Sequence, residues 1–276
     1  MAHIRNAGWQ ANGLVTLTTD FGLRDPFVGV MKGVLLARFP RAQLIDLTHG
    51  ILAHWPAEAG FWLARSAAYF SSGTLHVAVV DPGVGSSRRI LMAEANDQLF
   101  LAPDNGLLGS VLERLEIGGV WELEPGRQPG IFPTRISATF HGRDLFAPAA
   151  AALASGELRP EQLGKSCDSW VPSWIDEVRL EGNTIKGVVV TIDHFGNLLT
   201  NIDGNLVRRM ADPHVYLAGR TLPLKRTYSD VQPGDDLALL NSFDVLEIAR
   251  AQGNAAEALG LERGAPVVVQ DGVRHR

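Results

Sequence analysis

Two strand-like segments in the first half of the chain each run directly into an aspartate. GLVTLTTD (13–20) ends on Asp20, and TLHVAVVD (74–81) ends on Asp81. Between them, QLIDL (43–47) is strand-like, whereas FVGVMKGVLLARF (27–39) and WPAEAGFWLARSAAYF (55–70) are helix-like. This alternation favours a sheet with crossover helices. Because ligands bind at the carboxyl ends of strands in open α/β sheets, both aspartates are expected at a ligand-binding edge.

Further along, RILMAEA (89–95) is strand-like, and NGLLGSVLERL (105–115) and DLFAPAAAALASG (144–156) are helix-like. The helix expected over 27–39 should have Asp25 as its N-cap and Pro26 as its first helical residue. Asp144 stands at a position where it, too, is expected to act as an N-cap. The first 166 residues are therefore expected to form one α/β domain.

The pattern changes after a polar stretch that contains Trp and Pro, CDSWVPSWIDE (167–177), which is typical of a linker. Beyond it, short strands are broken by turn sequences: EGN, DHFGN, LAGR, QPGDD and ERGAP. This pattern predicts a smaller antiparallel β domain over residues 178–276.

Composition narrows the possible partners. The chain is 46% hydrophobic and 20% charged, which is typical of a soluble globular protein. No apolar stretch approaches the roughly 18 residues of a bilayer span, and the first ten residues lack the apolar centre of a signal peptide. We therefore expect a cytoplasmic protein with no membrane partner. The net charge of −5 without a basic run argues against nucleic acid, and the single Cys167 excludes an internal disulfide.

Several familiar chemistries are missing from the sequence. The run from Gly83 to Arg88 begins like a dinucleotide-binding fingerprint, but Arg88 replaces the third glycine and a strand follows in place of a helix. There is no P-loop, HExxH, CxxC or G-x-S-x-G motif, and the histidines lack metal-ligand spacing. We expect no metal and no cofactor, and hence a cofactor-free or substrate-activated reaction.

A carboxylate, a guanidinium and an imidazole stand in Gly-rich turns: Asp81 and Arg88 in DPGVGSSRR (81–89), and His141 in TFHGRDLFAP (139–148). Brought into one pocket, these groups can orient and polarise a water molecule. Each also has an ordinary structural explanation. Asp81 can be a turn residue, Arg88 a solvated charge, and His141 a hydrogen-bonded structural histidine.

Six ordered segments give the chain a resemblance to a known family over nearly its whole length. They are TTDFGLRDPFVGVMKG, VVDPGVGSSRR, FLAPDNGLL, TFHGRDLFAPAAA, IDHFGNLLTNI and NSFDVLEIARAQGNAAEALG. The chain resembles the S-adenosyl-L-methionine (SAM) hydrolases that form adenosine, also called SAM hydroxide adenosyltransferases, which are related to the SAM-dependent fluorinase and chlorinase. The resemblance implies hydrolysis of SAM to adenosine and methionine by attack at C5′. It also implies a C-terminal β-barrel-like domain and a homotrimer with intersubunit sites.

The resemblance further implies that Asp81, Arg88 and His141 form the hydrolytic set. Tyrosine stands at the positions of Asp81 and His141 in the halide-using relatives, and Gly142 replaces a halide-contacting serine. These differences favour a hydrolase. Two alternatives stay open, a halogenase-like enzyme and a non-catalytic protein that binds SAM or adenosine.

The substrate-binding residues that the resemblance implies come from both domains. Asp20 would accept hydrogen bonds from the ribose hydroxyls, and Asp25 would lie near the methionine moiety unless it only caps the helix. In the second domain the implied residues are Asp193 toward the methionine ammonium, Phe195 as a wall, Asn197 toward adenine, and Ser242, Glu247, Asn254 and Ala255 around methionine and adenine. On sequence alone, DHFGN (193–197) is equally typical of a tight β-turn.

The proposed chemistry places the difficulty on the nucleophile. The sulfonium of SAM leaves as a neutral thioether, so its departure requires neither acid nor metal. Bulk water has a pKa of about 15.7 and must be deprotonated or stabilised as hydroxide. Arg88 cannot accept a proton. Asp81 and His141 can, and the sequence does not decide between them.

Overall fold

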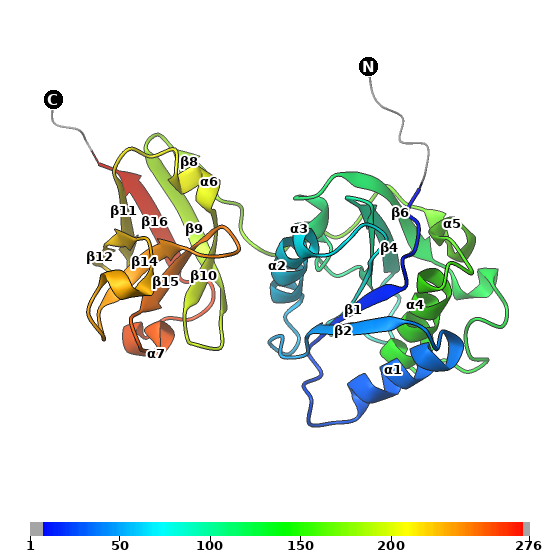
Figure 1. The fold of residues 1–276 in the computed structure, drawn as a ribbon. Coiled ribbons are helices and arrows are strands. Elements are labelled where there is room, and N and C mark those ends of the chain that lie inside the picture. The colour runs from blue at the N-terminus through cyan, green and yellow to red at the C-terminus, as the bar shows by residue number, and fades with distance from the viewer. Residues whose placement is uncertain (1–7, 273–276) are drawn as a thin grey trace, which may run out of the picture. The chain divides into compact units, whose positions relative to one another are not determined.

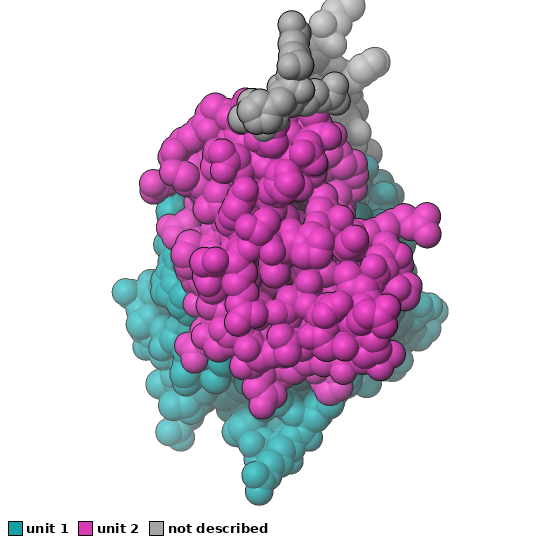
Figure 2. All heavy atoms as spheres, turned by 90° about the vertical axis from the view of Figure 1, so that its left-hand side faces the viewer, with its two compact units in different colours: residues 1–174 teal, residues 175–276 magenta. Residues whose placement is uncertain are grey.

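A computed structural model of the chain describes residues 8–272 and shows two compact units, Met1–Trp174 and Ile175–Arg276 (Figure 1). Figure 2 colours the first unit teal and the second magenta. Each unit is described separately below.

The first unit is built on a seven-stranded sheet with the strand order β2-β1-β3-β5-β4-β6-β7. The four strands β2, β1, β3 and β5 are mutually parallel, whereas β4, β6 and β7 join the sheet antiparallel. The sheet is therefore mixed. Its strands are β1 (Leu14–Thr19), β2 (Gln43–Thr48), β3 (Leu75–Val79), β4 (Ile90–Ala95), β5 (Gln98–Pro103), β6 (Ile117–Leu123) and β7 (Gly164–Ser166).

Helices cover both faces of this sheet, as the sequence pattern predicts (Figure 1). One face packs against α1 (Phe27–Arg38) and α4 (Ala147–Ala154), and the other against α2 (Pro56–Ser66) and α3 (Gly109–Leu112). Side chains of β3 and the residue after it alternate between the two cores, with Val77 and Val79 on the first face and Ala78 and Val80 on the second. A central strand buried on both sides accounts for the continuous apolar run in the sequence.

Two of the expected helix starts are wrong. Pro26 occupies the N-cap position of α1, and no side chain caps this helix, so Asp25 does not act as its N-cap. Asp144 lies inside a helical turn instead of ahead of one. Its carboxylate accepts hydrogen bonds from the Ser137 backbone N–H (2.7 Å) and from Arg143. It therefore anchors the segment that precedes the turn.

The helix expected over 144–156 begins with a π-helical turn, η3 (Gly142–Phe146), before α4. Pro148 explains the wide turn, because proline lacks an N–H and its ring clashes with the carbonyl four residues earlier. The helix expected over 105–115 shrinks to the single turn of α3. Short helical segments complete this unit: η1 (Ala67–Tyr69), η2 (Pro125–Arg127) and α5 (Pro160–Leu163).

The second unit is a nearly closed, barrel-like sheet in which the pairing is antiparallel except between β13 and β14. A hydrogen bond from Arg220 on β12 to Asp236 on β14 (3.2 Å) links strands near the two ends of the strand order. The strands are β8 (Arg179–Glu181), β9 (Thr184–Ile192), β10 (Leu198–Asp203), β11 (Pro213–Leu217), β12 (Arg220–Leu222), β13 (Leu224–Lys225), β14 (Asp236–Leu240), β15 (Val245–Arg250) and β16 (Pro266–Asp271). Short helices α6 (Gly204–Val207), η4 (Tyr228–Asp230) and α7 (Ala255–Leu259) lie between strands.

Residues 167–174 pack onto the first unit. The Asp104 carboxylate accepts hydrogen bonds from the Val171 backbone N–H (2.8 Å) and from Arg89 Nε (2.8 Å), and Arg89 also donates to the Ser169 carbonyl (2.9 Å). The FLAPDNGLL segment therefore holds this polar stretch in place. Within residues 8–272, none of the helices has the length and apolarity needed to cross a bilayer.

Candidate active site

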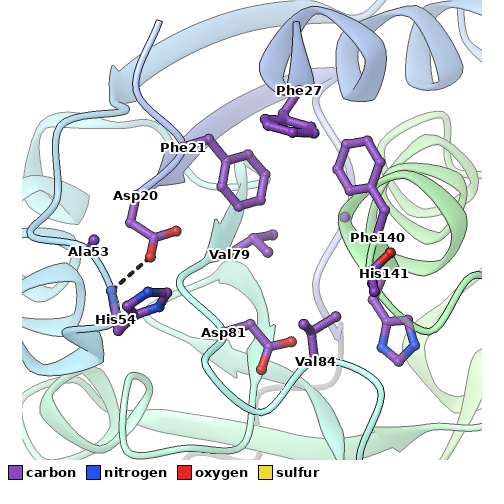
Figure 3. A pocket seen from close by; sticks show the side chains of 12 residues that line it. Asp20, Phe21, Phe27, Ala53, His54, Val79, Asp81, Val84, Phe140 and His141 are labelled. Carbon is purple, nitrogen blue, oxygen red and sulfur yellow. Dashed lines mark hydrogen bonds between the residues drawn. The ribbon is translucent and has the colours of Figure 1, made fainter. Parts of the chain in front are cut away.

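A cavity of about 340 Å³ opens in the first unit beyond the ends of the adjacent parallel strands β1 and β3 (Figure 3). Asp20 follows β1 by one residue and Asp81 follows β3 by two, and both line this cavity. The lining residues are Asp20, Phe21, Phe27, Ala53, His54, Val79, Asp81, Val84, Thr139, Phe140, His141 and Gly142. The cavity therefore lies at the sheet edge where the two strand-terminal carboxylates are expected.

Arg88 links Asp81 to His141. Its Nε donates to both oxygens of Asp81 (3.0 Å and 2.8 Å), and its Nη2 donates to Oδ2 of Asp81 (2.5 Å). The same Nη2 lies 2.7 Å from Nδ1 of His141. The side chains of Asp81 and Arg88 are only 4% and 10% exposed, so water screens this ion pair weakly. The structure therefore brings the three expected residues into one cluster, with Arg88 behind the cavity wall.

The hydrogen bond between Arg88 and His141 fixes the tautomer of the imidazole. Guanidinium has donors and no acceptor, so Nδ1 of His141 must accept, and the proton of the neutral ring lies on Nε2. Burial and the neighbouring Arg88 cation lower the pKa of His141 below its ordinary value. His141 therefore presents an N–H and not a basic nitrogen in this arrangement.

Close backbone packing joins the turn that carries Asp81 and Arg88 to the segment that carries His141. Gly85 has a φ of +81°, and a Cβ at this position would lie 2.2 Å from the Ala138 carbonyl oxygen. Only glycine permits both this backbone conformation and this approach. On the other side, the Asn105 side chain donates to the Val80 carbonyl (2.9 Å), directly before Asp81.

A loop after β2 holds the carboxylate of Asp20. The His54 backbone N–H donates to Oδ2 of Asp20 (2.9 Å), and His54 adopts a φ of +64°, which is unfavourable for a residue with a side chain. Thr19 Oγ1 lies 2.9 Å from Nδ1 of His49 and accepts from the Phe21 backbone N–H (3.2 Å). These contacts fix the β1 terminus and leave Oδ1 of Asp20 available to a ligand.

Sequence reasoning missed the aromatic part of the cavity wall. Phe21, Phe27 and Phe140 pack edge to face, with ring centroids 5.4 Å to 6.2 Å apart. Phe21 directly follows Asp20, and Phe140 directly precedes His141. Their adjacency to the expected site residues is the signal that could have identified them.

Asp25 is exposed and is not among the residues that line the cavity. Among residues 8–272, no group of three or more His, Cys, Asp or Glu side chains is arranged to hold a metal ion. The lining carboxylates are therefore Asp20 and Asp81, at two different places on the wall.

In the second unit, the DHFGN segment forms a tight turn stabilised by its own aspartate. Oδ1 of Asp193 accepts from the backbone N–H groups of Phe195 and Asn197 (both 2.9 Å), and Oδ2 accepts from the Asn197 side chain (3.0 Å). Asn197 is buried, whereas the ring of Phe195 at the tip is 72% exposed. The turn therefore presents an aromatic ring on a rigid backbone.

The turn packs against the start of α7, which brings five of the expected residues together. Asn254 is the N-cap of α7 and accepts from the Glu257 backbone N–H (2.9 Å). Its amide lies so close to Gly196 that a side chain on Gly196 would overlap it. Ala255, the first residue of α7, is fully buried in the core of this unit.

Glu247 is buried and forms hydrogen bonds within the same unit. Its carboxylate accepts from the Tyr228 hydroxyl (2.7 Å) and from the Asn241 amide (2.9 Å). Burial raises the pKa of Glu247. Burial and the adjacent Glu247 also raise the pKa of Tyr228. Ser242 is exposed in the turn after β14, next to Asn241.

The structure is that of a protein with an α/β unit and a β unit, and a cavity lies at the carboxyl edge of the mixed sheet in the first unit. The chain belongs to the SAM hydroxide adenosyltransferase family. Residues 15–164 match the N-terminal domain of that family, and residues 187–268 match its C-terminal domain.

Similar proteins cover nearly the whole chain. The (R)-S-adenosyl-L-methionine hydrolase of Thermus thermophilus is 39% identical over 259 residues, which span 92% of this chain and 98% of that protein. A crystal structure of an uncharacterized conserved protein from Thermotoga maritima matches with a TM-score of 0.86 at 32% identity, covering 93% of this chain and 99% of that chain. A fluorinase of Actinoplanes sp. is 25% identical over 94% of this chain and 97% of its own length.

Proposed function

We propose that this protein hydrolyses SAM to adenosine and L-methionine by attack of water at C5′. The observation that carries the proposal is the Asp81–Arg88–His141 cluster, whose Asp81 and His141 reach the cavity wall. Family membership and the hydrolase names of the similar proteins support the substrate and the reaction.

Asp81 and His141 can hold one water molecule between an acceptor and a donor. Oδ1 of Asp81 receives one hydrogen bond from Arg88, so it retains a lone pair for the water, and Nε2 of His141 supplies a donor. A carboxylate is too weak a base to generate free hydroxide from water beforehand. The water proton therefore moves to Asp81 as the C5′–O bond forms and the C5′–S bond breaks.

The departing group needs no further assistance, because the sulfonium leaves as a neutral thioether. The reaction proposed here therefore uses neither metal nor cofactor. Asp20, with Oδ1 open to the cavity, would accept a hydrogen bond from a ribose hydroxyl and set the position of C5′.

The second unit is proposed to complete the site of a neighbouring subunit in a cytoplasmic homotrimer. Support comes from the exposed Phe195 on its hydrogen-bonded turn. Asp193, Asn197, Asn254 and Ala255 form that turn and the helix start it contacts, and Glu247 and Ser242 belong to the neighbouring strand region. Asp25, which is exposed and lies two residues before the cavity-lining Phe27, is proposed to lie near the methionine moiety.

A halogenase-like reaction has less support. A Cβ on Gly142 would lie 2.9 Å from Sδ of Met31 and 3.2 Å from the Phe140 ring, so a serine at this position would require Met31 to shift. The fluorinases are also the more distant relatives, at 25% identity. A protein that binds SAM without turnover would have no need for the Asp81–Arg88–His141 water site.

The test is to incubate the purified protein with SAM in oxygen-18 water and to analyse the products by chromatography and mass spectrometry. We expect adenosine and methionine in equal amounts, with the label on the 5′-hydroxyl of adenosine. Methylthioadenosine or adenine as the main product, or unlabelled adenosine, would overturn direct attack at C5′. A parallel reaction with added fluoride or chloride should yield no halogenated nucleoside.

A further inference from the structure

The three phenyl rings and the water-holding residues occupy different sides of the cavity. Figure 3 shows Phe21, Phe27 and Phe140 grouped together, apart from Asp81 and Val84. The ring centroids of Phe27 and Phe140 are 5.4 Å apart at an interplanar angle of 86°, and Phe21 packs against both. Edge-to-face packing turns the rings in different directions, so the cluster offers both faces and edges to a ligand.

The aromatic part of the wall is formed by apolar rings. The carboxylates that line the cavity are Asp20, held by the His54 backbone N–H, and Asp81, held by Arg88. A positive charge placed against the rings would therefore meet aromatic π-electrons. An aromatic face attracts a cation within about 6 Å of its centroid.

We propose that Phe21, Phe27 and Phe140 form a sulfonium-selective wall that distinguishes SAM from neutral thioether nucleosides. This inference rests on the proposed function. Attack in line at C5′ requires the sulfur to lie opposite the nucleophile. If water is held at Asp81 and His141, the sulfonium is directed away from them, toward the part of the wall that the rings form.

Aromatic rings also suit the reaction better than a carboxylate would. A carboxylate beside the sulfonium would stabilise the charged substrate strongly, and that stabilisation would be lost as the charge disappears in the transition state. Rings provide a weaker attraction and an apolar contact that persists once the thioether is neutral. The wall therefore selects the charged substrate at a small cost to the rate of reaction.

Phe27 is the sharpest position for a test. The Arg143 guanidinium already lies 5.4 Å from the centroid of Phe140, so that ring is shared with another cation. Phe27 is 45% exposed, and replacing it with leucine keeps an apolar side chain without emptying a packed core. Phe70, which packs against His76 and is not among the cavity-lining residues, provides a matched control.

The experiment measures affinities for SAM and for its neutral thioether, S-adenosyl-L-homocysteine, by calorimetry in an Asp81→Asn background that suppresses turnover. Phe27→Leu should weaken SAM binding about five- to tenfold and change binding of the thioether by less than about twofold. Phe70→Leu should change neither. Phe27→Tyr, which keeps the aromatic ring, should retain the preference for SAM.

Equal weakening of both ligands by Phe27→Leu would overturn the inference, because the rings would then supply only apolar contact. The inference would also be overturned if the wild-type protein preferred SAM over the thioether no more strongly than Phe27→Leu does. The proposed reaction fails separately, if SAM binds with this selectivity but the wild-type protein forms no adenosine.

Discussion

Arg88 determines the tautomer of His141, because guanidinium only donates hydrogen bonds. It donates to Asp81 through two nitrogens, and its contact with Nδ1 leaves the proton of the neutral His141 ring on Nε2. Protonation of His141 would place a second cation against Arg88. The pKa of His141 is accordingly lowered. The structure thus supports Asp81 as the proton acceptor, a choice that the sequence leaves open.

We expect Asp81→Ala to lower the turnover of SAM by about 10²- to 10⁴-fold while SAM still binds, because the acceptor for the water proton is lost. His141→Ala should be impaired as well, through loss of the Nε2 donor. Arg88→Lys should also be slow, since an ammonium cannot span Asp81 and His141 as the planar guanidinium does. Steady-state kinetics and calorimetry measure these effects. Turnover at the wild-type rate by Asp81→Ala would contradict the assignment.

His76 predicts acid sensitivity of the first unit. The residue is fully buried in β3, and burial lowers its pKa from 6.5 to about 4. Between these pH values the unfolded chain binds the proton more readily than the folded chain. The contribution of His76 to the free energy of unfolding is therefore complete above about pH 6.5. It falls by up to about 3 kcal/mol as the pH decreases toward 4.

Denaturant unfolding at several pH values measures this loss, and His76→Gln should show a flatter pH dependence. Gln98 and Thr16 keep a polar partner in that variant, because a glutamine amide can replace the ring nitrogens near them. An unchanged pH dependence in His76→Gln would assign the acid sensitivity to other groups.

At the scale of elements, the site depends on loops that touch at a few backbone atoms. Gly85→Ala should destabilise the protein by about 1–3 kcal/mol and reduce turnover, because the new Cβ would push against the Ala138 carbonyl and separate Arg88 from His141. Thermal unfolding and turnover measure the two effects. Gly130→Ala is the control, with a φ of +92° but open space around it. Equal effects of both substitutions would show that backbone strain alone is responsible.

Thr19→Val should raise the KM for SAM about three- to tenfold with little change in kcat. The substitution removes the Thr19 hydroxyl and with it the contacts to His49 and to the Phe21 backbone N–H that fix the chain around Asp20. Thr19→Ser restores the hydroxyl and should restore KM. The loss of affinity should disappear for ligands without ribose hydroxyls. We therefore expect 2′,3′-dideoxyadenosine to bind Thr19→Val as tightly as it binds the wild-type protein. A purely structural defect would weaken adenosine and dideoxyadenosine equally.

The elements that sequence predicts well are those with local signals. Periodicity and turn sequences predict the strands that end near Asp20 and Asp81. They also predict the helices that flank the sheet and the change to short strands in the second unit. The helix start at Asp25 fails because a boundary depends on a one-residue difference in backbone geometry. The contacts between Gly85 and Ala138 and between Phe27 and Phe140 join segments far apart in the chain, so no local pattern announces them.

At the scale of the whole molecule, the expected site residues divide between two separately packed units. The hydrolytic cluster and Asp20 belong to the first, and the turn with Asp193 and Phe195 belongs to the second. Most polar groups of that turn are engaged within it, and the exposed Phe195 ring is the residue that can be altered without unfolding it. Phe195 is therefore the position from which to test whether the two units act in one site.

The proposed homotrimer with intersubunit sites makes a quantitative prediction for mixed assemblies. Phe195→Ala and Asp81→Ala proteins should each be a trimer by light scattering and each be nearly inactive. Equal amounts of the two proteins are unfolded and refolded together. If a site takes its two units from different subunits, each unit is unsubstituted in about half of cases, so both are unsubstituted in about a quarter. Activity should therefore return to about a quarter of wild type. If each site instead used both units of one chain, every site would carry one substitution, and mixing would restore nothing. Persistent inactivity of the mixture, or full activity of Phe195→Ala alone, would therefore contradict the shared site.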